Sequence, residues 1–368
     1  MLKISFCTVC MNRLQHLKET LQANIEANQD YANLEFVLLD YNSTDGVEDY
    51  IRNHMSYYIK SGKLVYYKTT SHLYFNRSHS RNVAFRLATG DVLCNIDADN
   101  FTGIGFAAYV NEAFSKANDI FLSVFNNNLL NKSDVLGRIC VRKADFYKVT
   151  GYDERMVNYG FEDYDLVNRL ELYGLTKTPI TGNPGFFNVI EHERNTRLEN
   201  EYLTNKLNDV LISYLSPSSS EVLLLLTDNT YKRGVVIDNK SLRLAGAVID
   251  EAQQEYQYSI LGDEWAQGLW SGDSEHIDLY STSDTVQTLF YETAGGYYTL
   301  SDMPKKLFYQ VSSHDLIEQV IMFCSQVTNR IYMWKNKLNK TYAVNSVFGN
   351  DTVYKNLNFN NPIYTHQI

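Results

Sequence analysis

Two aspartates at the end of an apolar run are the strongest candidates for chemistry in this sequence. Asp97 and Asp99 are separated by one residue and follow residues 91–96, which are predicted to form a strand. Side chains two positions apart on an extended segment point to the same side. One or two carboxylates can hold a divalent cation that bridges the phosphates of a nucleotide, so a metal site is one interpretation. A surface turn that carries two acids is the other, and the spacing leaves both open.

A second pair of acids accompanies a predicted helix over residues 164–173. Glu162 and Asp163 lie just before or at the start of this helix, within the run Gly-Phe-Glu-Asp of residues 160–163. The helix dipole favours ionised carboxylates at that end, and an ionised carboxylate can accept the proton of an attacking hydroxyl group. Acids also cap helices. Because capping alone does not require the whole run, we favour a role for this pair in the chemistry.

Strand and helix patterns alternate through the first hundred residues and would position these acids. Apolar runs predict strands at residues 2–9, 34–39, 64–67 and 91–96, and the spacing of apolar residues predicts helices at 14–27, 47–58 and 80–89. Gly90 is the expected C-cap of the last helix. Such alternation implies a mostly parallel sheet with helices on both faces. Ligands bind beyond the carboxyl ends of such strands, which is where the polar clusters at residues 12–13, 40–45 and 97–99 fall.

The second half of the sequence has a different pattern, in which short strand-like runs replace the alternation of strands and helices. A helix is predicted over residues 197–214, followed by a linker in the Ser-Pro-Ser-Ser-Ser stretch of residues 216–220. Short strand-like runs follow at residues 221–227, 234–237, 242–248, 276–280, 286–291 and 297–300, before a predicted helix over 315–336. We therefore expect two domains, one over residues 1–215 and a smaller, β-rich domain over residues 221–368.

Composition limits the class of protein. The 368 residues are 44% hydrophobic and 21% charged, which is typical of globular domains. A formal net charge of -10 makes a broad nucleic-acid surface a poor interpretation, although a small basic pocket could still hold one diphosphate. The five cysteines are scattered, which argues against a disulfide framework and for a reducing compartment. Cys7 and Cys10 form a CxxC without a second pair, so strand packing explains them better than zinc does.

The lengths of the apolar runs limit how the protein could associate with a membrane. No window approaches the about 20 apolar residues of a transmembrane helix, and the apolar run at the N-terminus is too short for a signal peptide. We expect a cytoplasmic protein without a transmembrane segment. The sequence leaves open a peripheral contact at the inner face of the membrane.

Residues 80–100, with the sequence SRNVAFRLATGDVLCNIDADN, resemble the signature of family 2 of the GT-A glycosyltransferases. The triplet Phe-Asn-Arg of residues 75–77, taken with Asn82 and Val83, is similar to a block in the β-1,4-galactosyltransferases. The resemblance implies a Rossmann-like GT-A fold over about the first 200 residues. It also implies Asp99 as a metal ligand and Asp97 as a ribose or metal contact. Nucleotide or phosphate contacts are implied for three arginines, for which surface ion pairs are the alternative: Arg13, Arg77 and Arg81.

The turn after the second predicted strand is a weaker match. Asp40, with residues 42–46, looks like the turn that holds the nucleobase in this family, and Tyr41 stands in place of a second aspartate. An ordinary Asx-type turn explains the same residues equally well.

Residues 151–170 resemble the acidic element of galactosyltransferases and of chondroitin-polymerase-type enzymes. The resemblance implies Asp163 as general base and Glu162 as a contact to the acceptor sugar. It also implies acceptor contacts for Tyr159 and Gly160, although Tyr159 replaces the usual tryptophan. Phe161 and Tyr164 depart from the family's glycine and acid.

His192 occupies the place of the family's histidine metal ligand, and neutral imidazole binds Mn²⁺ well beside carboxylates. A single histidine is more often a surface or core residue. Only the position of His192 in the family's pattern therefore supports a role as metal ligand. Val189 stands where galactosyltransferases have a methionine, and it cannot bind a metal.

The resemblance implies an inverting glycosyltransferase that uses Mn²⁺ (or Mg²⁺) and a UDP-sugar donor. The expected donor sugar is a hexose, with galactose or N-acetylgalactosamine ahead of glucose, and the expected partner is a glycan acceptor, with a lipid-linked acceptor left open. Surface-polysaccharide synthesis is the implied pathway. A catalytically weak carbohydrate-binding or scaffold protein with the same fold is the main alternative. A sugar nucleotidyltransferase is a third, against which the lack of a glycine-rich phosphate loop near the N-terminus counts.

Overall fold

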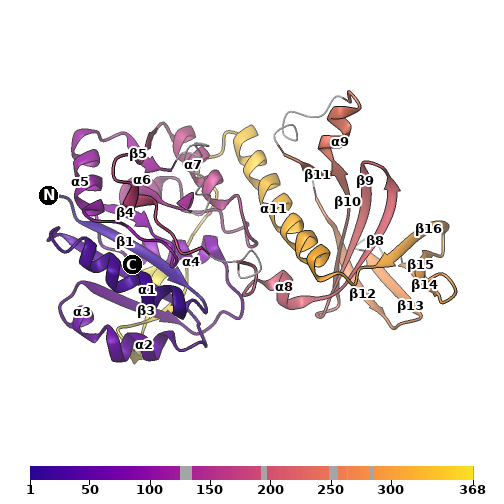
Figure 1. Cartoon of the computed structure of the whole chain (residues 1–368), viewed down its shortest axis with the longest axis horizontal. Helices are drawn as coiled ribbons and strands as arrows, with labels where there is room; N and C mark the ends of the chain where they lie inside the picture. The colour runs from indigo at the N-terminus through magenta and orange to yellow at the C-terminus, as the bar shows by residue number, and fades with distance from the viewer. Residues whose placement is uncertain (125–134, 192–196, 248–255, 263, 282–285, 368) are drawn as a thin grey trace. The chain divides into compact units, whose positions relative to one another are not determined.

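The computed structural model describes the chain except for residues 125–134, 192–196, 248–255, 263, 282–285 and 368. It divides into two compact units (Figure 1). Unit 1 comprises Met1–Thr196 and Lys335–Ile368, and unit 2 comprises Arg197–Trp334.

Unit 1 is built on a nine-stranded sheet with the order β18-β17-β3-β2-β1-β4-β6-β5-β7. Its strands are β1 (Ile4–Cys10), β2 (Leu34–Tyr41), β3 (Leu64–Thr69), β4 (Val92–Asn95), β5 (Ile120–Ser123), β6 (Ile139–Arg142), β7 (Thr176–Pro179), β17 (Thr352–Lys355) and β18 (Asn358–Tyr364). Strands β3, β2, β1 and β4 run parallel, as predicted. The sheet as a whole is mixed rather than mostly parallel, because β6 lies antiparallel between β4 and β5, and β17 lies antiparallel on β3.

Helices cover both faces of this sheet and enclose two cores. The helices are α1 (Leu14–Ala27), α2 (Val47–His54), α3 (Ser56–Lys60), α4 (Arg77–Leu87), α5 (Phe106–Lys116), α6 (Lys143–Lys148) and α7 (Glu162–Tyr173). Side chains of α1, α2 and α5 pack in one core, and those of α4, α6 and α7 in the other. Alternate residues of β1 enter opposite cores, so Cys10 lies in the first and Cys7 in the second. Strand packing thus explains the CxxC, as predicted.

Of the two glycines that follow α4 and α7, only the one after α7 caps its helix. Gly174 follows α7 with φ 107° and is its C-cap. The prediction for Gly90 is wrong, because α4 ends at Leu87 and its C-cap is Ala88 in an extended conformation. A Cβ at Gly90 would lie 2.5 Å from Ser5 Oγ. Close contact with β1, rather than helix capping, therefore requires glycine at that position.

The C-terminal segment belongs to unit 1, which differs from the predicted domain over residues 221–368. Strand β17 pairs with β3 through Tyr354 and Lys68, and through Lys355 and Tyr67. Val353 is fully buried in the second core. At the other boundary, residues 197–215 belong to unit 2 rather than to the predicted domain 1–215. Pairing with strands far away in the sequence sets both boundaries.

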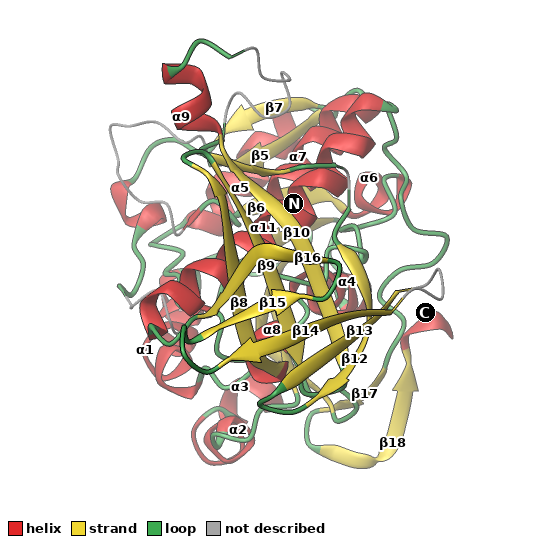
Figure 2. Cartoon of the chain, turned by 90° about the vertical axis from the view of Figure 1, so that its right-hand side faces the viewer, coloured by secondary structure: helices red, strands yellow, loops and turns green. Residues whose placement is uncertain are grey.

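Unit 2 is a nine-stranded antiparallel sheet in the order β11-β10-β12-β13-β14-β15-β16-β8-β9, and a further pairing of β10 with β9 closes it on itself. Figure 2 shows the curvature of these strands. They are β8 (Leu207–Ser216), β9 (Ser219–Leu226), β10 (Thr230–Asp238), β11 (Tyr258–Ile260), β12 (Ala266–Gly272), β13 (His276–Ser281), β14 (Val286–Glu292), β15 (Tyr297–Leu300) and β16 (Met303–Gln310). The predicted β-rich unit is confirmed, and its interior is filled by side chains such as Leu223, Leu289 and Phe308.

Three local predictions in this unit are wrong. Residues 197–214 form only a short helix, α8 (Tyr202–Lys206), before β8 begins. The predicted linker at residues 216–220 is the hairpin turn between β8 and β9, in which Ser216 pairs with Ser219. Of the strand predicted at residues 242–248, the first three residues are the end of α9 (Asn239–Leu244), and the described residues after them form no strand. Pairing of β8 with β9 and β16 outweighs the helical pattern of its sequence.

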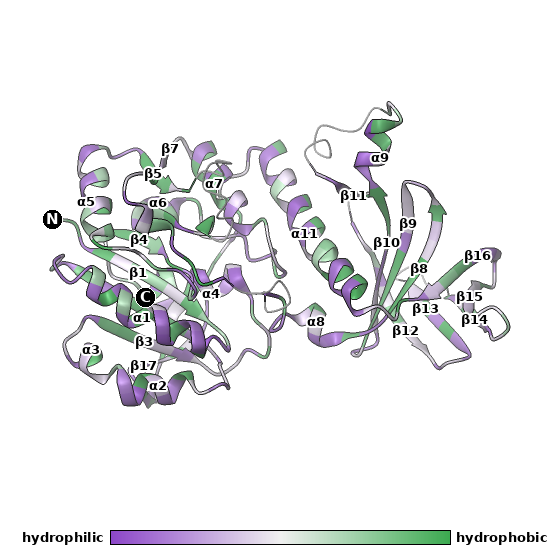
Figure 3. Ribbon diagram, viewed as in Figure 1, coloured by the Kyte–Doolittle hydropathy of each residue, from purple (hydrophilic) through white to green (hydrophobic). Residues whose placement is uncertain are grey.

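Helix α11 (His314–Leu338) confirms the helix predicted over residues 315–336, and the unit boundary falls within it. Figure 3 shows hydrophobic and hydrophilic residues alternating along this helix. Val320, Ile321, Cys324 and Val327 are buried and recur at helical spacing. In the described part of the chain, no helix has both the length and the apolar character needed to cross a bilayer.

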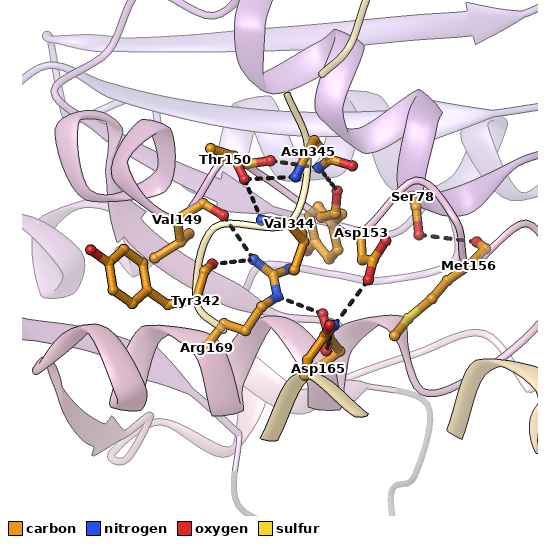
Figure 4. A network of polar contacts seen from close by, with 12 residues as sticks. Ser78, Val149, Thr150, Asp153, Met156, Asp165, Arg169, Tyr342, Val344 and Asn345 are labelled. Atoms are coloured by element: carbon orange, nitrogen blue, oxygen red, sulfur yellow. Dashed lines mark hydrogen bonds and ion pairs between the residues drawn. The ribbon is translucent and has the colours of Figure 1, made fainter. Parts of the chain in front are cut away.

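A buried polar network joins α7 to the C-terminal segment within unit 1 (Figure 4). Asp165 and Arg169 are fully buried and bind each other, with Nε 2.6 Å from Oδ2. Arg169 Nη1 also donates to the carbonyl oxygens of Val149 and Tyr342, at 2.9 and 3.2 Å. The Asn336 amide donates to Asp165 and to Asp153, at 2.9 Å each. The aspartate and arginine that follow the acidic pair in the sequence therefore hold the fold.

Replacing Asn336 with alanine should destabilise unit 1 by about 1–3 kcal/mol, because each of two buried carboxylates loses a hydrogen bond. Urea denaturation of the variant and the wild type would measure the change. Asn339, which directly follows α11 and is exposed, provides a matched control. Its alanine variant should change stability by less than about 0.5 kcal/mol. Equal unfolding midpoints for the two variants would contradict this role.

Candidate active site

One buried arginine gathers the acids of both sequence motifs. Arg81 of α4 is 5% exposed. Its Nη2 lies 2.9 Å from Asp97 Oδ1, just beyond β4. Its Nη1 lies 2.9 Å from Asp163 Oδ1 and 3.3 Å from Glu162 Oε1, at the start of α7. Segments far apart in the sequence thus bring three carboxylates together at the carboxyl end of β4.

These contacts differ from the role expected for Arg81. The resemblance implied a contact to the nucleotide or its phosphates, but the guanidinium is occupied by carboxylates. Burial favours loss of its proton, yet the charges of Asp163 and Asp97 hold the pKa of Arg81 above its ordinary value. Arg81 is therefore a permanent positive charge that offsets the acids around it.

The backbone before α7 explains how the acidic pair reaches this position. Gly160 and Phe161 both have positive φ, at 92° and 69°. Glu162 and Asp163 then occupy the first two positions of α7, where the helix dipole favours negative charge. Phe161 stands where the related enzymes have glycine, and a left-handed conformation costs a non-glycine residue roughly 1–2 kcal/mol. Phe161 therefore takes up a conformation that glycine would adopt at lower cost.

Asp163 has the electrostatic environment of a proton acceptor. Burial raises its pKa to about 7, and the negative charges of Glu162 and Asp97 act in the same direction, while Arg81 opposes them. A carboxyl group with a pKa near neutrality can take up and release a proton at the pH of the cell. This environment fits the general-base role that the sequence suggested.

Asp97 and Asp99 are both partly exposed beside this cluster. Asn95 Nδ2 donates to Asp97 Oδ1 at 2.9 Å, and Asn100 Nδ2 donates to Asp99 Oδ1 at 2.7 Å. The Asp99 carbonyl oxygen accepts from Ile190 N at 2.8 Å. Carboxylate oxygens on neighbouring, partly exposed side chains are a donor set that suits Mn²⁺ or Mg²⁺.

The segment that leads to His192 contacts Asp99 and Asn100. Val189 forms an antiparallel bridge with Asn100, and Ile190 binds the backbone of Asp99. His192 itself lies outside the described residues. The structure therefore brings the preceding residues to Asp99, and the role of His192 as a metal ligand stays a prediction.

Gly137 lies close to Arg81, Asp97 and Asp163, and its importance was not identified from the sequence. A Cβ there would lie 2.6 Å from Asp97 Oδ2, and 3.2 Å from both Arg81 Nη2 and Asp163 Oδ2. We expect Gly137→Ala to displace Asp97 and to lower the rate of catalysis by about 100-fold, as misplacements of about 1 Å can do.

Initial rates measured beside thermal melting would test the effect of Gly137→Ala. Gly185→Ala is a suitable control, because the three atoms nearest to its added Cβ all belong to the side chain of Asn183, at 3.1 Å or more. A folded Gly137→Ala variant with the wild-type rate would show that the position of Asp97 is not critical.

Arg138 is a second buried arginine that sequence reasoning missed. It is 1% exposed, and its Nη2 donates to Asn100 Oδ1 at 3.1 Å and to the Phe101 carbonyl oxygen at 3.0 Å. Its Nε and Nη1 find no hydrogen-bond partner among the described residues. Burial lowers its pKa to about 10. A lone arginine in the apolar run of residues 135–141 was the available signal, and its contacts hold the turn that follows Asp99.

Asp40 is fully buried, and both of its carboxylate oxygens serve the fold. Oδ1 accepts from Ser43 N at 2.7 Å, and Oδ2 accepts from the Tyr66 hydroxyl at 2.8 Å. Burial raises the pKa of Asp40. These contacts support the interpretation of residues 42–46 as an Asx-type turn, while a contact from Asp40 to a nucleobase stays a prediction. Asn12 contacts this turn, because its Oδ1 accepts from Thr44 N at 2.8 Å. Arg13 follows Asn12 directly in the sequence.

Arg77 and Tyr159 lie together. The Arg77 guanidinium is 4.5 Å from the centre of the Tyr159 ring and 5.3 Å from that of Phe75. Tyr159 and Gly160 are half-buried and directly precede the acidic pair. A residue expected to contact the donor and two expected to contact the acceptor therefore adjoin in the structure.

Two family models match the part of the chain that carries this site. Residues 5–140 match Glycosyl transferase family 2, and residues 120–193 match the N-terminal domain of galactosyltransferase. Both models describe glycosyltransferase domains, and both matched regions lie within unit 1. The N-terminal region of unit 1 is therefore similar to family 2, and the segment that follows it is similar to the N-terminal domain of galactosyltransferase. No curated protein sequence matches the chain.

The chain is also similar to solved glycosyltransferase structures. A mannosyltransferase from Pyrobaculum calidifontis, in complex with GDP-Man and Mn²⁺, is 19% identical over 50% of this chain and 55% of its own, with a TM-score of 0.42. S. aureus TarS with UDP is 15% identical over 49% and 58%, with a TM-score of 0.41. TarS with UDP-GlcNAc is 14% identical over 51% and 62%, with a TM-score of 0.36. The chain thus spans little more than half the length of these proteins.

Proposed function

We propose that the protein transfers a hexose from a UDP-sugar to a hydroxyl group of a glycan acceptor, with inversion at the anomeric carbon. The convergence of Asp97, Glu162 and Asp163 on Arg81 carries this proposal. The match to a galactosyltransferase domain favours galactose or N-acetylgalactosamine as the donor sugar.

Mn²⁺ (or Mg²⁺) is the proposed cofactor. Asp97 and Asp99 would hold it, with His192 as a further ligand. When bound, the metal supplies positive charge that stabilises the departing diphosphate. The hydrogen bonds from Asn95 and Asn100 would fix the orientation of the two carboxylates, as outer partners of metal ligands commonly do.

Asp163 would carry out the proton transfer. Its carboxylate takes the proton of the acceptor hydroxyl as the hydroxyl oxygen forms a bond to the anomeric carbon. The bond between that carbon and the diphosphate oxygen breaks, and UDP leaves with the electron pair. Arg81 holds Asp163 in place without removing it from the partly exposed site.

Glu162 would orient the acceptor. It is almost fully buried, and its Oε2 finds no hydrogen-bond partner among the described residues. A buried carboxylate oxygen without a partner is costly, and a hydroxyl group of the acceptor sugar could donate to it. Tyr159 and Gly160, just before α7, would line the same acceptor site.

The second candidate is a carbohydrate-binding or scaffold protein that kept the fold but lost most of its activity. Phe161, held at positive φ where the related enzymes have glycine, favours it, as do Tyr159 and Val189. We also propose that unit 2 is an accessory domain, and that the protein works on the cytoplasmic side of the membrane in surface-polysaccharide synthesis, where a lipid-linked glycan is one acceptor to test.

A screen for UDP release separates these candidates. Common nucleotide sugars would be incubated with the protein, Mn²⁺ and glycan acceptors. We expect turnover to be highest with UDP-galactose or UDP-N-acetylgalactosamine, and to cease when a chelator is added. Saturable binding of UDP without turnover of any donor would favour the scaffold protein. Turnover unaffected by the chelator would show that the reaction does not require a metal.

A further inference from the structure

Two histidines and an aspartate, none of them part of the acidic cluster, meet beside the loop that follows β3. His72 belongs to this loop, His79 to the first turn of α4, and Asp351 to the segment just before β17. One ligand atom from each of these side chains lies within 4.8 Å of the other two. All three residues belong to unit 1 and are partly buried.

Each side chain of this group is held in place by neighbours. His72 Nε2 lies 2.8 Å from Asp351 Oδ2, and the His72 ring stacks on Tyr41 with centroids 4.1 Å apart. His79 Nδ1 lies 2.8 Å from the Tyr41 hydroxyl, and its Nε2 lies 3.0 Å from the Asn350 carbonyl oxygen. Because a carbonyl oxygen only accepts, the hydrogen of neutral His79 is on Nε2, and Nδ1 accepts from Tyr41.

We propose that His72, His79 and Asp351 form a zinc site. Two neutral imidazoles and a carboxylate are a ligand set that binds Zn²⁺ with tetrahedral geometry, and they leave one position for water. When zinc takes the place of the Nε2 hydrogen of His79, the proton of that ring moves to Nδ1, which then donates to the Tyr41 hydroxyl. Tyr41 is thus placed to orient the ligand as an outer hydrogen-bond partner.

A simple hydrogen-bonded pair would need only His72 and Asp351. The second imidazole brings a third ligand atom into range, and Tyr41 contacts both rings. Asp351 also accepts from Thr69 Oγ1 at 3.2 Å and from the backbone of Thr352 at 2.7 Å, so its carboxylate is fixed from the other side. The site would fasten the segment before β17 to the loop after β3, next to the turn that contains Asp40 and Tyr41.

Metal titration of the full chain tests this proposal. Chelator-treated protein, without nucleotide, would be titrated with ZnCl₂ by calorimetry and with CoCl₂ by visible absorption, in which tetrahedral Co²⁺ absorbs far more strongly than octahedral Co²⁺. We expect one zinc equivalent, a tetrahedral cobalt spectrum and a rise in the melting temperature with zinc. His72→Ala and Asp351→Asn should each weaken binding by at least about 10-fold. His54→Ala, at an exposed histidine of α2, should leave binding unchanged.

Several results would overturn the proposal. These are the absence of saturable zinc binding, an octahedral cobalt spectrum, or wild-type affinity in both His72→Ala and Asp351→Asn. The Asp99→Asn variant separates this site from the acidic cluster, because zinc binding there should persist in that variant. Loss of zinc binding in Asp99→Asn would place the metal at the acidic cluster instead.

Discussion

Replacing Asp163 with asparagine should lower the rate of sugar transfer by about 100- to 10,000-fold, the range that a positioned general base contributes. Asparagine keeps the shape of the side chain and its contact with Arg81 but cannot accept the proton of the acceptor hydroxyl. Arg81 still binds Asp97 and Glu162 in this variant, so the fold should persist. Single-turnover rates at saturating donor would isolate the chemical step from binding.

Glu171→Gln provides the matched control for Asp163→Asn. Glu171 lies on the same helix, α7, but is exposed. Its substitution also removes one negative charge and should leave the transfer rate within a factor of about two, since surface substitutions have small effects. A folded Asp163→Asn protein that transfers sugar at the wild-type rate would show that another group is the base.

Replacing Arg81 with glutamine should destabilise unit 1 by about 3–5 kcal/mol, the cost of removing one partner from a buried ion pair. Asp97, Glu162 and Asp163 would then lie together without a compensating positive charge. Their pKa values in the folded protein would rise above those in the unfolded chain. The loss of stability should therefore be largest at neutral pH and shrink as the pH is lowered, because protonated carboxyls no longer repel one another.

Urea denaturation without metal, repeated across pH, would measure the effect of Arg81→Gln. Arg52→Gln is the control, because Arg52 forms an exposed pair with Glu48 at 2.8 Å and should change stability by only about 0–1 kcal/mol. Adding Glu162→Gln to Arg81→Gln should restore part of the stability. If Arg81→Gln were as stable as Arg52→Gln, the cluster would not depend on this arginine.

The sequence predicted those elements whose own side chains determine them. Helix α1 has the predicted bounds, Leu14–Ala27, because its apolar residues recur at helical spacing and all face one core. Strand β15, Tyr297–Leu300, is also as predicted. By contrast, β8 is a strand because β9 and β16 pair with it, and β17 because β3 and β18 do, while their own residues carry no clear strand pattern.

The same distinction applies to the candidate site. The alternation of strands and helices predicted that residues 97–99 would lie at the carboxyl ends of the parallel strands. Asp163 was linked to the same site only by the resemblance to known glycosyltransferases. The pattern could not show that Arg81 binds carboxylates, because an arginine at that place serves a phosphate equally well. Gly137 and Arg138 escaped notice because their importance lies in contacts with residues about 40 positions away.

Calorimetric titration of UDP with and without Mn²⁺, on the wild type and on Asp99→Asn, tests most directly whether unit 1 holds a metal-dependent nucleotide site. We expect saturable binding that Mn²⁺ strengthens by about 5- to 150-fold, the usual range for two coupled ligands, and we expect Asp99→Asn to abolish this gain. Binding of equal strength in all four titrations, or no binding in any of them, would contradict the account.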